Sequence, residues 1–210
     1  MNLRGLYAIT PDPTRRALPL EQAVDQAIRG GARIIQYRDK SDDADRRHRE
    51  AKSLLAVCRH HGVPLIVNDD LQLAADIGAD GIHLGKDDSD PTQARRILGA
   101  GKLIGISCYN RLENAELARE RGADYIAFGR FFPSRSKPLA VPADQALLRR
   151  ARERCDLPLV AIGGISPENG GPLIAAGADM LAVIDAVFGQ PDIRAAAADL
   201  NRLFEMEESR

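Results

Sequence analysis

The chain has 210 residues, of which 44% are hydrophobic and 28% are charged, a composition typical of a globular protein rather than a disordered or fibrous one. Its 29 Lys and Arg nearly balance 30 Asp and Glu, it has no Trp, and aromatic residues make up only 4%. Without a basic excess or stacking side chains, nucleic acid is not expected as a partner. The length predicts a single domain over residues 1–210, near the lower limit of about 200 residues for an eight-stranded β/α barrel.

The N-terminal residues show no secretory signal, because residues 1–7 lack a charged flank followed by an apolar core. No later apolar run approaches the roughly 20 residues that span a bilayer, so we expect a cytoplasmic protein. Cys58, Cys108 and Cys155 are odd in number and widely separated, which fits neither a disulfide framework nor a zinc site. We expect Cys58 and Cys155 to be reduced packing residues.

Short apolar runs alternate with helical patterns along the whole chain. Strands are predicted near residues 5–9, 34–38, 65–68, 81–84, 103–107, 125–128, 159–162 and 180–184. Apolar residues at three- and four-residue spacing predict helices over residues 20–29, 43–60, 71–77, 91–98, 111–121, 143–154, 167–176 and 193–204. This alternation, with no linker between two halves, favours a closed α/β TIM barrel of eight parallel strands over an open doubly wound sheet.

A short glycine-containing motif recurs where a helical pattern stops and a strand begins. Its copies are Gly-Ala-Arg at residues 31–33 and Gly-Ala-Asp at residues 78–80, 122–124 and 177–179. Glycine can adopt the left-handed conformation that closes a helix, so the motif predicts helix-to-strand turns. The spacing of the copies, roughly forty to fifty-five residues, accommodates two β/α units each, which makes eight units in all.

Charged and amide side chains follow three of the predicted strands. They are Gln36, Tyr37, Arg38, Asp39 and Lys40 after the second, Asn68, Asp69 and Asp70 after the third, and Lys86, Asp87 and Asp88 after the fourth. In a β/α barrel the carboxyl ends of the strands form the active face, so we expect these side chains to meet at one rim.

Asp69 and Asp88 send one carboxylate each to that rim from neighbouring strands. Mg²⁺ is usually held by one or two protein carboxylates, with water and substrate phosphates as the other ligands. The alternative is that Asp69 or Asp70 caps the next helix and that Asp88 is a solvated loop residue.

Arg38 and Lys40 rise beside these carboxylates, and Lys137 arrives from the loop after the sixth strand. Three cations facing a metal site suit a pyrophosphate, because such contacts strengthen as a leaving group gains charge. The sequence therefore predicts stabilisation of an anionic leaving group. For Arg135, a solvated loop cation is the alternative to a ligand contact.

A second anion site is predicted after the seventh strand. Gly163 and Gly164 end that strand, and Ser166 and Pro167 suit the N-cap and first turn of the next helix. Free backbone N–H groups there can hold a phosphate, as the loops after strands seven and eight often do in these barrels. A glycine turn used only for packing is the alternative. Two anion sites, one with a metal, imply one substrate carrying a pyrophosphate and another carrying a monophosphate.

Nearly end to end, the sequence resembles the thiamine phosphate synthase family. The segments that carry the resemblance are LYAIT at 6–10, QYRDK at 36–40, NDD at 68–70, GIHLG at 81–85, GRFFPSRSK at 129–137, AIGGI at 161–165 and AVI at 182–184. The resemblance implies a Mg²⁺-dependent transferase that joins hydroxymethylpyrimidine diphosphate to a thiazole phosphate, releasing pyrophosphate and forming thiamine phosphate. Its partners would be these small molecules, with no nucleic acid or membrane, and homo-oligomerisation is left open.

The resemblance also implies a role for each residue of the predicted site. The pyrimidine diphosphate would be held by Gln36, Arg38, Lys40, Asn68, Ser107 and Lys137. Asp69 and Asp88 would ligate Mg²⁺, and the thiazole phosphate would be received by Ser134, Ser136, Gly164 and Ile184. Tyr37, Asp39, Arg135 and Asp185 complete the predicted substrate-binding set, and the catalytic cations would be Arg38, Lys40 and Lys137.

The sequence contains no convincing nucleophile. Ser107 could be read as one, but we expect no His beside it, and His83 is expected to be a packed or hydrogen-bonded core residue of its strand. Two positions depart from the family pattern: Tyr109 stands where His is common, and Asp185 where Ser or His is common. An anion at Asp185 would oppose phosphate binding unless it caps the short helix that follows or faces away, and we expect the cap.

Two other functions are weighed against the synthase. A thiazole tautomerase of the same family needs neither pyrophosphate nor metal, and would not be expected to retain the cations and carboxylates together. A non-catalytic ligand-binding barrel would have no reason to retain them either.

Overall fold

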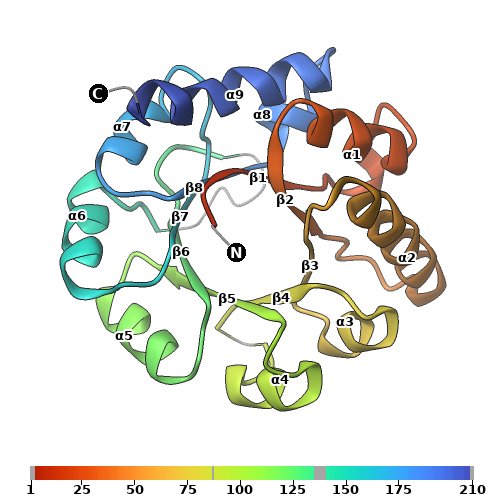
Figure 1. Cartoon of the computed structure of the whole chain (residues 1–210), viewed down its shortest axis with the longest axis horizontal. Helices are drawn as coiled ribbons and strands as arrows, with labels where there is room; N and C mark the ends of the chain where they lie inside the picture. Colours follow the sequence, from red (N-terminus) through yellow and green to blue (C-terminus); the bar gives the residue numbers. More distant parts are fainter. Residues whose placement is uncertain (1–2, 87, 135–140, 209–210) are drawn as a thin grey trace.

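The computed structural model describes residues 3–86, 88–134 and 141–208, in which eight parallel strands close into one barrel with each strand hydrogen-bonded to the next in chain order (Figure 1). The strands are β1 Gly5–Ile9, β2 Ala32–Tyr37, β3 Leu65–Asn68, β4 Gly81–Leu84, β5 Leu103–Tyr109, β6 Tyr125–Gly129, β7 Leu159–Ile162 and β8 Met180–Val183. The predicted TIM barrel is confirmed.

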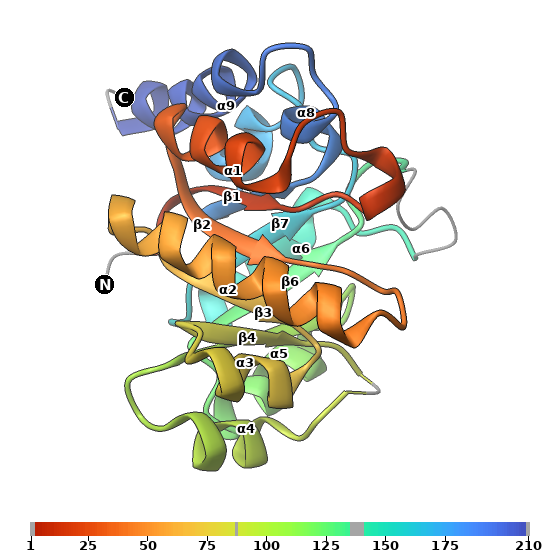
Figure 2. The same cartoon turned by 90° about the vertical axis from the view of Figure 1, so that its right-hand side faces the viewer.

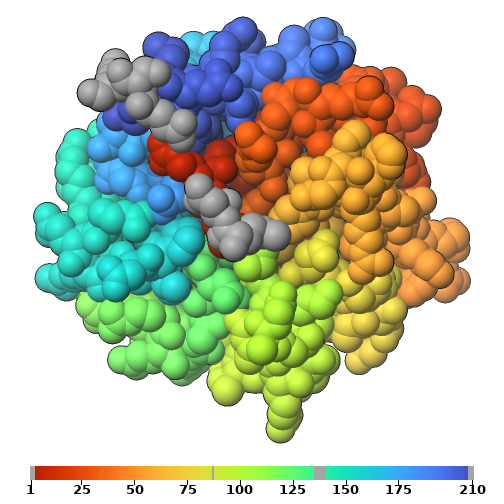
Figure 3. Space-filling model, viewed as in Figure 1, coloured from red at the N-terminus to blue at the C-terminus, as the bar shows by residue number. Residues whose placement is uncertain are grey.

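Helices cover the outside of the barrel, and their colours follow one another around the rim in chain order (Figures 1 and 3). They are α1 Leu20–Arg29, α2 Ala44–His61, α3 Leu71–Ile77, α4 Pro91–Leu98, α5 Leu112–Glu120, α6 Gln145–Arg154, α7 Gly171–Ala175, α8 Asp185–Phe188 and α9 Ile193–Glu208, with a 3-10 turn η1 at Pro13–Arg15. None of the helices within the described ranges is both long and apolar enough to cross a membrane.

Aspartates cap the start of several helices. Asp43, Asp70, Asp90 and Asp144 each accept a hydrogen bond from a backbone N–H in the first turn of α2, α3, α4 and α6. The capping residue lies just outside the helix, so α2 and α6 begin one and two residues later than the predicted ranges 43–60 and 143–154.

The predicted helix over residues 167–176 is wrong in its first half, because α7 begins only at Gly171. Asn169 replaces the expected helical turn with local bonds: its Oδ1 accepts from the Ser166 N–H at 2.8 Å and its Nδ2 donates to the Gly164 carbonyl at 3.1 Å. Asparagine side chains compete with helical hydrogen bonding in this way. Ser166 is therefore not an N-cap.

The recurring Gly-Ala-Asp motif makes the turns that enter β4, β6 and β8, and its aspartates tie neighbouring strands together. The carboxylates of Asp80, Asp124 and Asp179 accept a backbone N–H at the start of the preceding strand, on Leu65 at 3.0 Å, Ile104 at 2.7 Å and Leu159 at 2.7 Å respectively. The glycines at 78, 122 and 177 have positive φ values of 68°, 82° and 111°, which confirms the predicted turns.

Side chains along each strand alternate between the barrel interior and the layer beneath the helices. In β1, Tyr7 and Ile9 belong to the interior cluster, whereas Leu6 and Ala8 belong to the cluster that includes the helices. Cys58, Cys108 and Cys155 are buried free thiols, as the sequence predicts for Cys58 and Cys155.

The carboxyl ends of the strands open at one end of the barrel. Figure 2 shows the loops after β1 and β2 leaving the barrel at the right-hand side, toward which the arrow of β2 points. This is the rim on which the sequence places the candidate site.

Candidate active site

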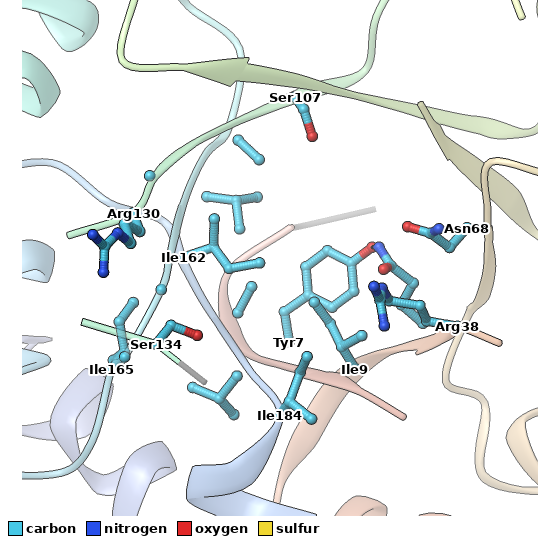
Figure 4. A pocket seen from close by; sticks show the side chains of 18 of the residues that line it. Tyr7, Ile9, Arg38, Asn68, Ser107, Arg130, Ser134, Ile162, Ile165 and Ile184 are labelled. Atoms are coloured by element: carbon cyan, nitrogen blue, oxygen red, sulfur yellow. The ribbon is translucent and has the colours of Figure 1, made fainter. Parts of the chain in front are cut away.

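A cavity of about 810 Å³ occupies the carboxyl end of the barrel. The predicted site residues that line it are Gln36, Arg38, Lys40, Asn68, Asp69, Asp88, Ser107, Ser134, Gly164, Ile184 and Asp185. In Figure 4 the ring of Tyr7 projects into the cavity, with Arg38 and Asn68 on one side and Ser134 and Ile165 on the other. Arg135, Ser136 and Lys137 lie outside the described residues.

Two of the predicted substrate-binding residues lie elsewhere. Tyr37 is buried on the helix-facing side of β2, where its hydroxyl donates to Glu50 at 2.9 Å. The Asp39 side chain is fully buried and pairs with Arg46 at 3.1 Å, inside the loop before α2. Strand alternation turns Tyr37 away from the interior face used by Gln36, so Tyr37 and Asp39 hold the loop rather than line the cavity.

The cations after β2 are held in place by neighbouring elements. The backbone N–H of Arg38 donates to Thr10 Oγ1 at 2.9 Å, and its guanidinium lies 3.5 Å from the carboxylate of Asp12 in the loop after β1. Lys40 forms an ion pair with Asp69. Both cations therefore reach the cavity with acidic partners that an incoming anion would share.

Asp69 and Asp70, though adjacent, have separate roles. Asp70 caps α3 by accepting the Leu73 N–H at 2.9 Å. Asp69 has a φ of 63°, a conformation that aspartate tolerates better than most residues, and its carboxylate accepts from Asn68 Nδ2 at 2.6 Å. The alternative that these carboxylates only cap a helix therefore holds for Asp70 and fails for Asp69, which lines the cavity.

Asp69 faces Asp88, whose Oδ2 also accepts the Gly85 backbone N–H at 2.7 Å. Burial and the hydrogen bond with Asp69 raise the pKa of Asp88 above its ordinary value. Burial acts in the same direction on Asp69, but its hydrogen bonds with Asp88 and Lys40 bring the pKa of Asp69 below its ordinary value. The two pKa values are shifted in opposite directions because adjacent negative charges repel, so the negative charge is favoured on Asp69.

This carboxyl pair has the oxygen donors that Mg²⁺ prefers, and a divalent cation there would offset the repulsion between the two carboxylates. Within residues 3–86, 88–134 and 141–208, no three His, Cys, Asp or Glu side chains gather into a metal-binding cluster. A metal at Asp69 and Asp88 would therefore need further ligands from water or a bound substrate.

The opposite side of the cavity is formed by glycine backbone. The loop after β6 lies against the turn after β7, with Phe132 N–H donating to the Gly163 carbonyl at 2.9 Å. Gly164 has a φ of 62°, and a Cβ there would lie 2.3 Å from the Pro133 carbonyl oxygen. Only glycine fits this turn, and its bare backbone is exposed to the cavity. Because α7 begins later than expected, this side has no helix start at Ser166 and Pro167.

Asp185 does not cap α8; it is the first residue of that helix, and the N-cap position is Ile184, which makes no side-chain cap bond. Its carboxylate lies 2.8 Å from the guanidinium of Arg15, which comes from η1 in the loop after β1. Both side chains are 36% exposed and both residues line the cavity. The prediction that Asp185 caps α8 is therefore wrong, and the positive charge of Arg15 balances the carboxylate of Asp185. Sequence reasoning missed Arg15, because nothing local connects it to Asp185.

His83 lies beside Ser107, contrary to expectation, with 2.9 Å between His83 Nε2 and Ser107 Oγ. Strands β4 and β5 pair with His83 opposite Gly105, so Ser107, two residues further along β5, faces the same interior as His83. His83 also contacts the hydroxyl of Tyr125 at 3.2 Å, which confirms a hydrogen-bonded role inside the barrel.

The sequence reasoning also missed Tyr7, a polar residue of the barrel interior. A usable signal was present, since Tyr7 and His83 occupy inward positions of predicted strands, where polar tips need partners. Tyr109, the other departure from the family pattern, also lines the cavity, and its hydroxyl accepts the Lys86 N–H at 3.2 Å.

The family model described as thiamine monophosphate synthase matches residues 6–187. The chain belongs to this family. The thiamine-phosphate synthase of Thiobacillus denitrificans is 55% identical over 206 residues, covering 97% of this chain and 96% of that protein. The thiamine-phosphate synthase of Nitrosococcus oceani is 54% identical over 203 residues, covering 97% and 94%.

A solved structure of thiamine phosphate pyrophosphorylase from Pyrococcus furiosus is similar over the whole barrel. Its TM-score is 0.87 at 34% sequence identity, and the match covers 98% of this chain and 97% of that one. The family resemblance inferred from the motifs is thereby confirmed at the level of both sequence and fold.

Proposed function

We propose that this chain is a thiamine-phosphate synthase that transfers the hydroxymethylpyrimidine group from its diphosphate to the nitrogen of a thiazole phosphate and releases pyrophosphate. The observation that carries the proposal is the shared cavity, in which Arg38 and Lys40 lie with the carboxyl pair of Asp69 and Asp88. Family membership supports the same transferase chemistry.

In the proposed reaction, the bond between the pyrimidine methylene carbon and the diphosphate oxygen breaks, and the oxygen keeps the electron pair. The thiazole nitrogen then donates its lone pair to the methylene carbon. Arg38 and Lys40 would stabilise the negative charge that builds on the departing oxygen, an effect that is strongest inside a protected cavity. Lys137, which lies outside the described residues, is included on sequence grounds.

Magnesium dependence is part of the proposal. Asp69 and Asp88 would hold the ion, and the ion would neutralise diphosphate charge. The thiazole phosphate would bind across the cavity, where Gly164 and Ile184, the residue before α8, line the wall. This arrangement keeps the two anionic groups on opposite sides.

The test is to mix the purified protein with both substrates, with and without Mg²⁺, and to follow pyrophosphate and thiamine phosphate. We expect both products only when both substrates and the metal are present. Isomerisation of a thiazole substrate without metal would instead indicate a tautomerase, and binding without turnover would indicate a ligand-binding barrel.

Lys137→Ala provides a finer test of leaving-group stabilisation. We expect a fall in kcat larger than the rise in KM, because the charge that Lys137 would stabilise develops in the transition state. A change confined to KM would show that Lys137 only binds the substrate.

A further inference from the structure

A continuous chain of hydrogen bonds crosses the barrel interior, and most of its members line the cavity. Gln36 Nε2 donates to the Tyr7 hydroxyl at 2.8 Å, the hydroxyls of Tyr7 and Tyr125 lie 2.8 Å apart, and the Tyr125 hydroxyl lies 3.2 Å from His83 Nδ1. His83 Nε2 then reaches Ser107 Oγ at 2.9 Å. We call these five residues the relay. Each comes from a different strand of the barrel.

The inner members of the relay are shielded from water. Tyr7 is 1% exposed, Tyr125 0%, Gln36 3% and His83 9%. Burial raises the pKa of both tyrosines well above the ordinary value, so each keeps its hydroxyl hydrogen at neutral pH. Each tyrosine therefore has one hydrogen to donate, and burial makes an unpaired donor costly.

The direction of the relay follows from counting these hydrogens. The Tyr7 oxygen accepts from Gln36, so its own hydrogen goes to its other close partner, Tyr125. The hydrogen of Tyr125 then goes to His83 Nδ1. A neutral imidazole that accepts at Nδ1 carries its proton on Nε2, and this proton faces Ser107.

We infer that the relay makes Ser107 a hydrogen-bond donor to the substrate, with Tyr7, Tyr125 and His83 as its positioning residues. Since Ser107 Oγ accepts from His83, its own hydrogen is left to point into the cavity that Ser107 lines. The acceptor would be an anionic or lone-pair atom of the bound pyrimidine diphosphate. The identity of that acceptor rests on the proposed function, whereas the direction of the relay does not.

The relay also explains why a Ser–His contact here is not a nucleophilic pair. In a serine hydrolase, His Nε2 accepts the serine hydrogen and a carboxylate accepts from Nδ1. Here Nδ1 faces a tyrosine hydroxyl, and the proton on Nε2 leaves His83 unable to act as a base toward Ser107. Ser107 is thus directed toward binding charge rather than toward attacking the substrate.

The direction can be measured on the resting protein, without substrate, from the ¹⁵N signals of the imidazole rings. The chain has four histidines, so His83→Gln assigns the signals of His83 by their loss. We expect a proton on Nε2 and a bare Nδ1, and loss of this single tautomer in Tyr125→Phe. Tyr37→Phe, which removes a buried hydroxyl on the outer side of the barrel, should leave the His83 signals unchanged. A proton on Nδ1, or on both nitrogens, would overturn the inference.

A double-mutant cycle tests whether the relay acts through Ser107. Ser107→Ala should lower kcat/KM by about 10- to 100-fold, the effect of losing one hydrogen bond to a charged group. Tyr125→Phe keeps the ring volume and should lower kcat/KM by about threefold to tenfold. In the Ser107→Ala background the same change should cost less than about twofold, because the group it positions is gone.

Equal losses from Tyr125→Phe in both backgrounds would mean that Tyr125 supports only the fold, and the inference would fail. Labelling of Ser107 by a serine-directed fluorophosphonate would also overturn it, because labelling needs a base-activated hydroxyl. If the wild-type protein formed no thiamine phosphate, the proposed function would fail while the ¹⁵N measurement still decided the direction of the relay.

Discussion

The two ends of the barrel use aspartate in opposite ways. At the amino end, Asp124 Oδ2 accepts from the Ile104 N–H at 2.7 Å and from Arg95 at 2.6 Å, and Asp179 has an equivalent pair of partners in Leu159 and Arg152. At the carboxyl end, Asp69 and Asp88 face each other, and their pKa values are shifted in opposite directions. The carboxylates at the amino end are paired with donors of the fold, whereas Asp69 and Asp88, besides their own donors, lie where their negative charges repel each other.

The largest expected effect is at the carboxyl end. Asp69→Asn should lower kcat/KM by about 100- to 1,000-fold and remove the dependence on Mg²⁺, because a ligand charge is lost where negative charge must be neutralised. The melting temperature should stay near the wild-type value, since this carboxylate ties no strands together. Steady-state kinetics over a Mg²⁺ titration, with thermal unfolding alongside, measures both.

Asp88→Asn is the matched variant for that test, since it removes the other half of the carboxyl pair. It should reduce activity similarly and leave stability equal or slightly higher, because it relieves the repulsion with Asp69. Near-normal Mg²⁺-stimulated rates in both variants would remove the two residues as metal ligands.

At the amino end of the barrel we expect the reverse, a loss of stability with no loss of activity. Asp124→Ala removes the carboxylate that accepts from the Ile104 N–H and pairs with Arg95, which should cost about 1–3 kcal/mol of unfolding free energy. For a chain of this size we expect the melting temperature to fall by about 2–4 °C for each kcal/mol, with kcat unchanged. Asp156→Ala, at an exposed position of the same end, is the control and should change stability by less than about 0.5 kcal/mol. A loss of kcat in folded Asp124→Ala would contradict the view that aspartates at the amino end of the barrel serve stability alone.

A smaller effect is expected at the ion pair of Arg15 and Asp185, where the carboxyl end does contain a matched acid. Asp185→Ser frees Arg15 and removes a negative charge near the proposed phosphate site. We expect the KM for thiazole phosphate to fall by about 1.5- to 5-fold, the range of a partly exposed pair. The same change in an Arg15→Ala background should have a larger effect, because the acid is then unbalanced. An unchanged KM in both backgrounds would show that Asp185 does not influence this substrate.

The smallest effect concerns stability and pH, at the pair of Asp25 on α1 and His61 at the end of α2, 2.8 Å apart. The hydrogen bond from His61 lowers the pKa of Asp25 below its ordinary value. The stabilisation is therefore present above the unfolded pKa of about 3.9 and is lost as pH falls through the lower folded value. Asp25→Asn should melt below the wild type at pH 6, and the gap should close in strong acid. A gap independent of pH would assign the effect to packing instead.

Much of the fold could be predicted from the sequence because the patterns that specify it are local. Strand alternation, helix spacing and the Gly-Ala-Asp turns act within one β/α unit, and the unit is repeated. The errors were local as well: Asn169 hydrogen-bonds the backbone in place of a helical turn before α7, and Asp144, inside the predicted range, is the N-cap, so that α6 begins at Gln145. Such side-chain competition for backbone hydrogen bonds is decided by a single residue and is invisible to periodicity.

The sequence by itself determined that Arg38, Lys40, Asp69 and Asp88 would share a rim, because parallel strands deliver their carboxyl ends to the same side of a barrel. Only the tertiary structure decided that Arg15 balances Asp185 and that His83 lies beside Ser107. Those contacts depend on the register between strands and on closure of the barrel, which bring together side chains that no local pattern connects.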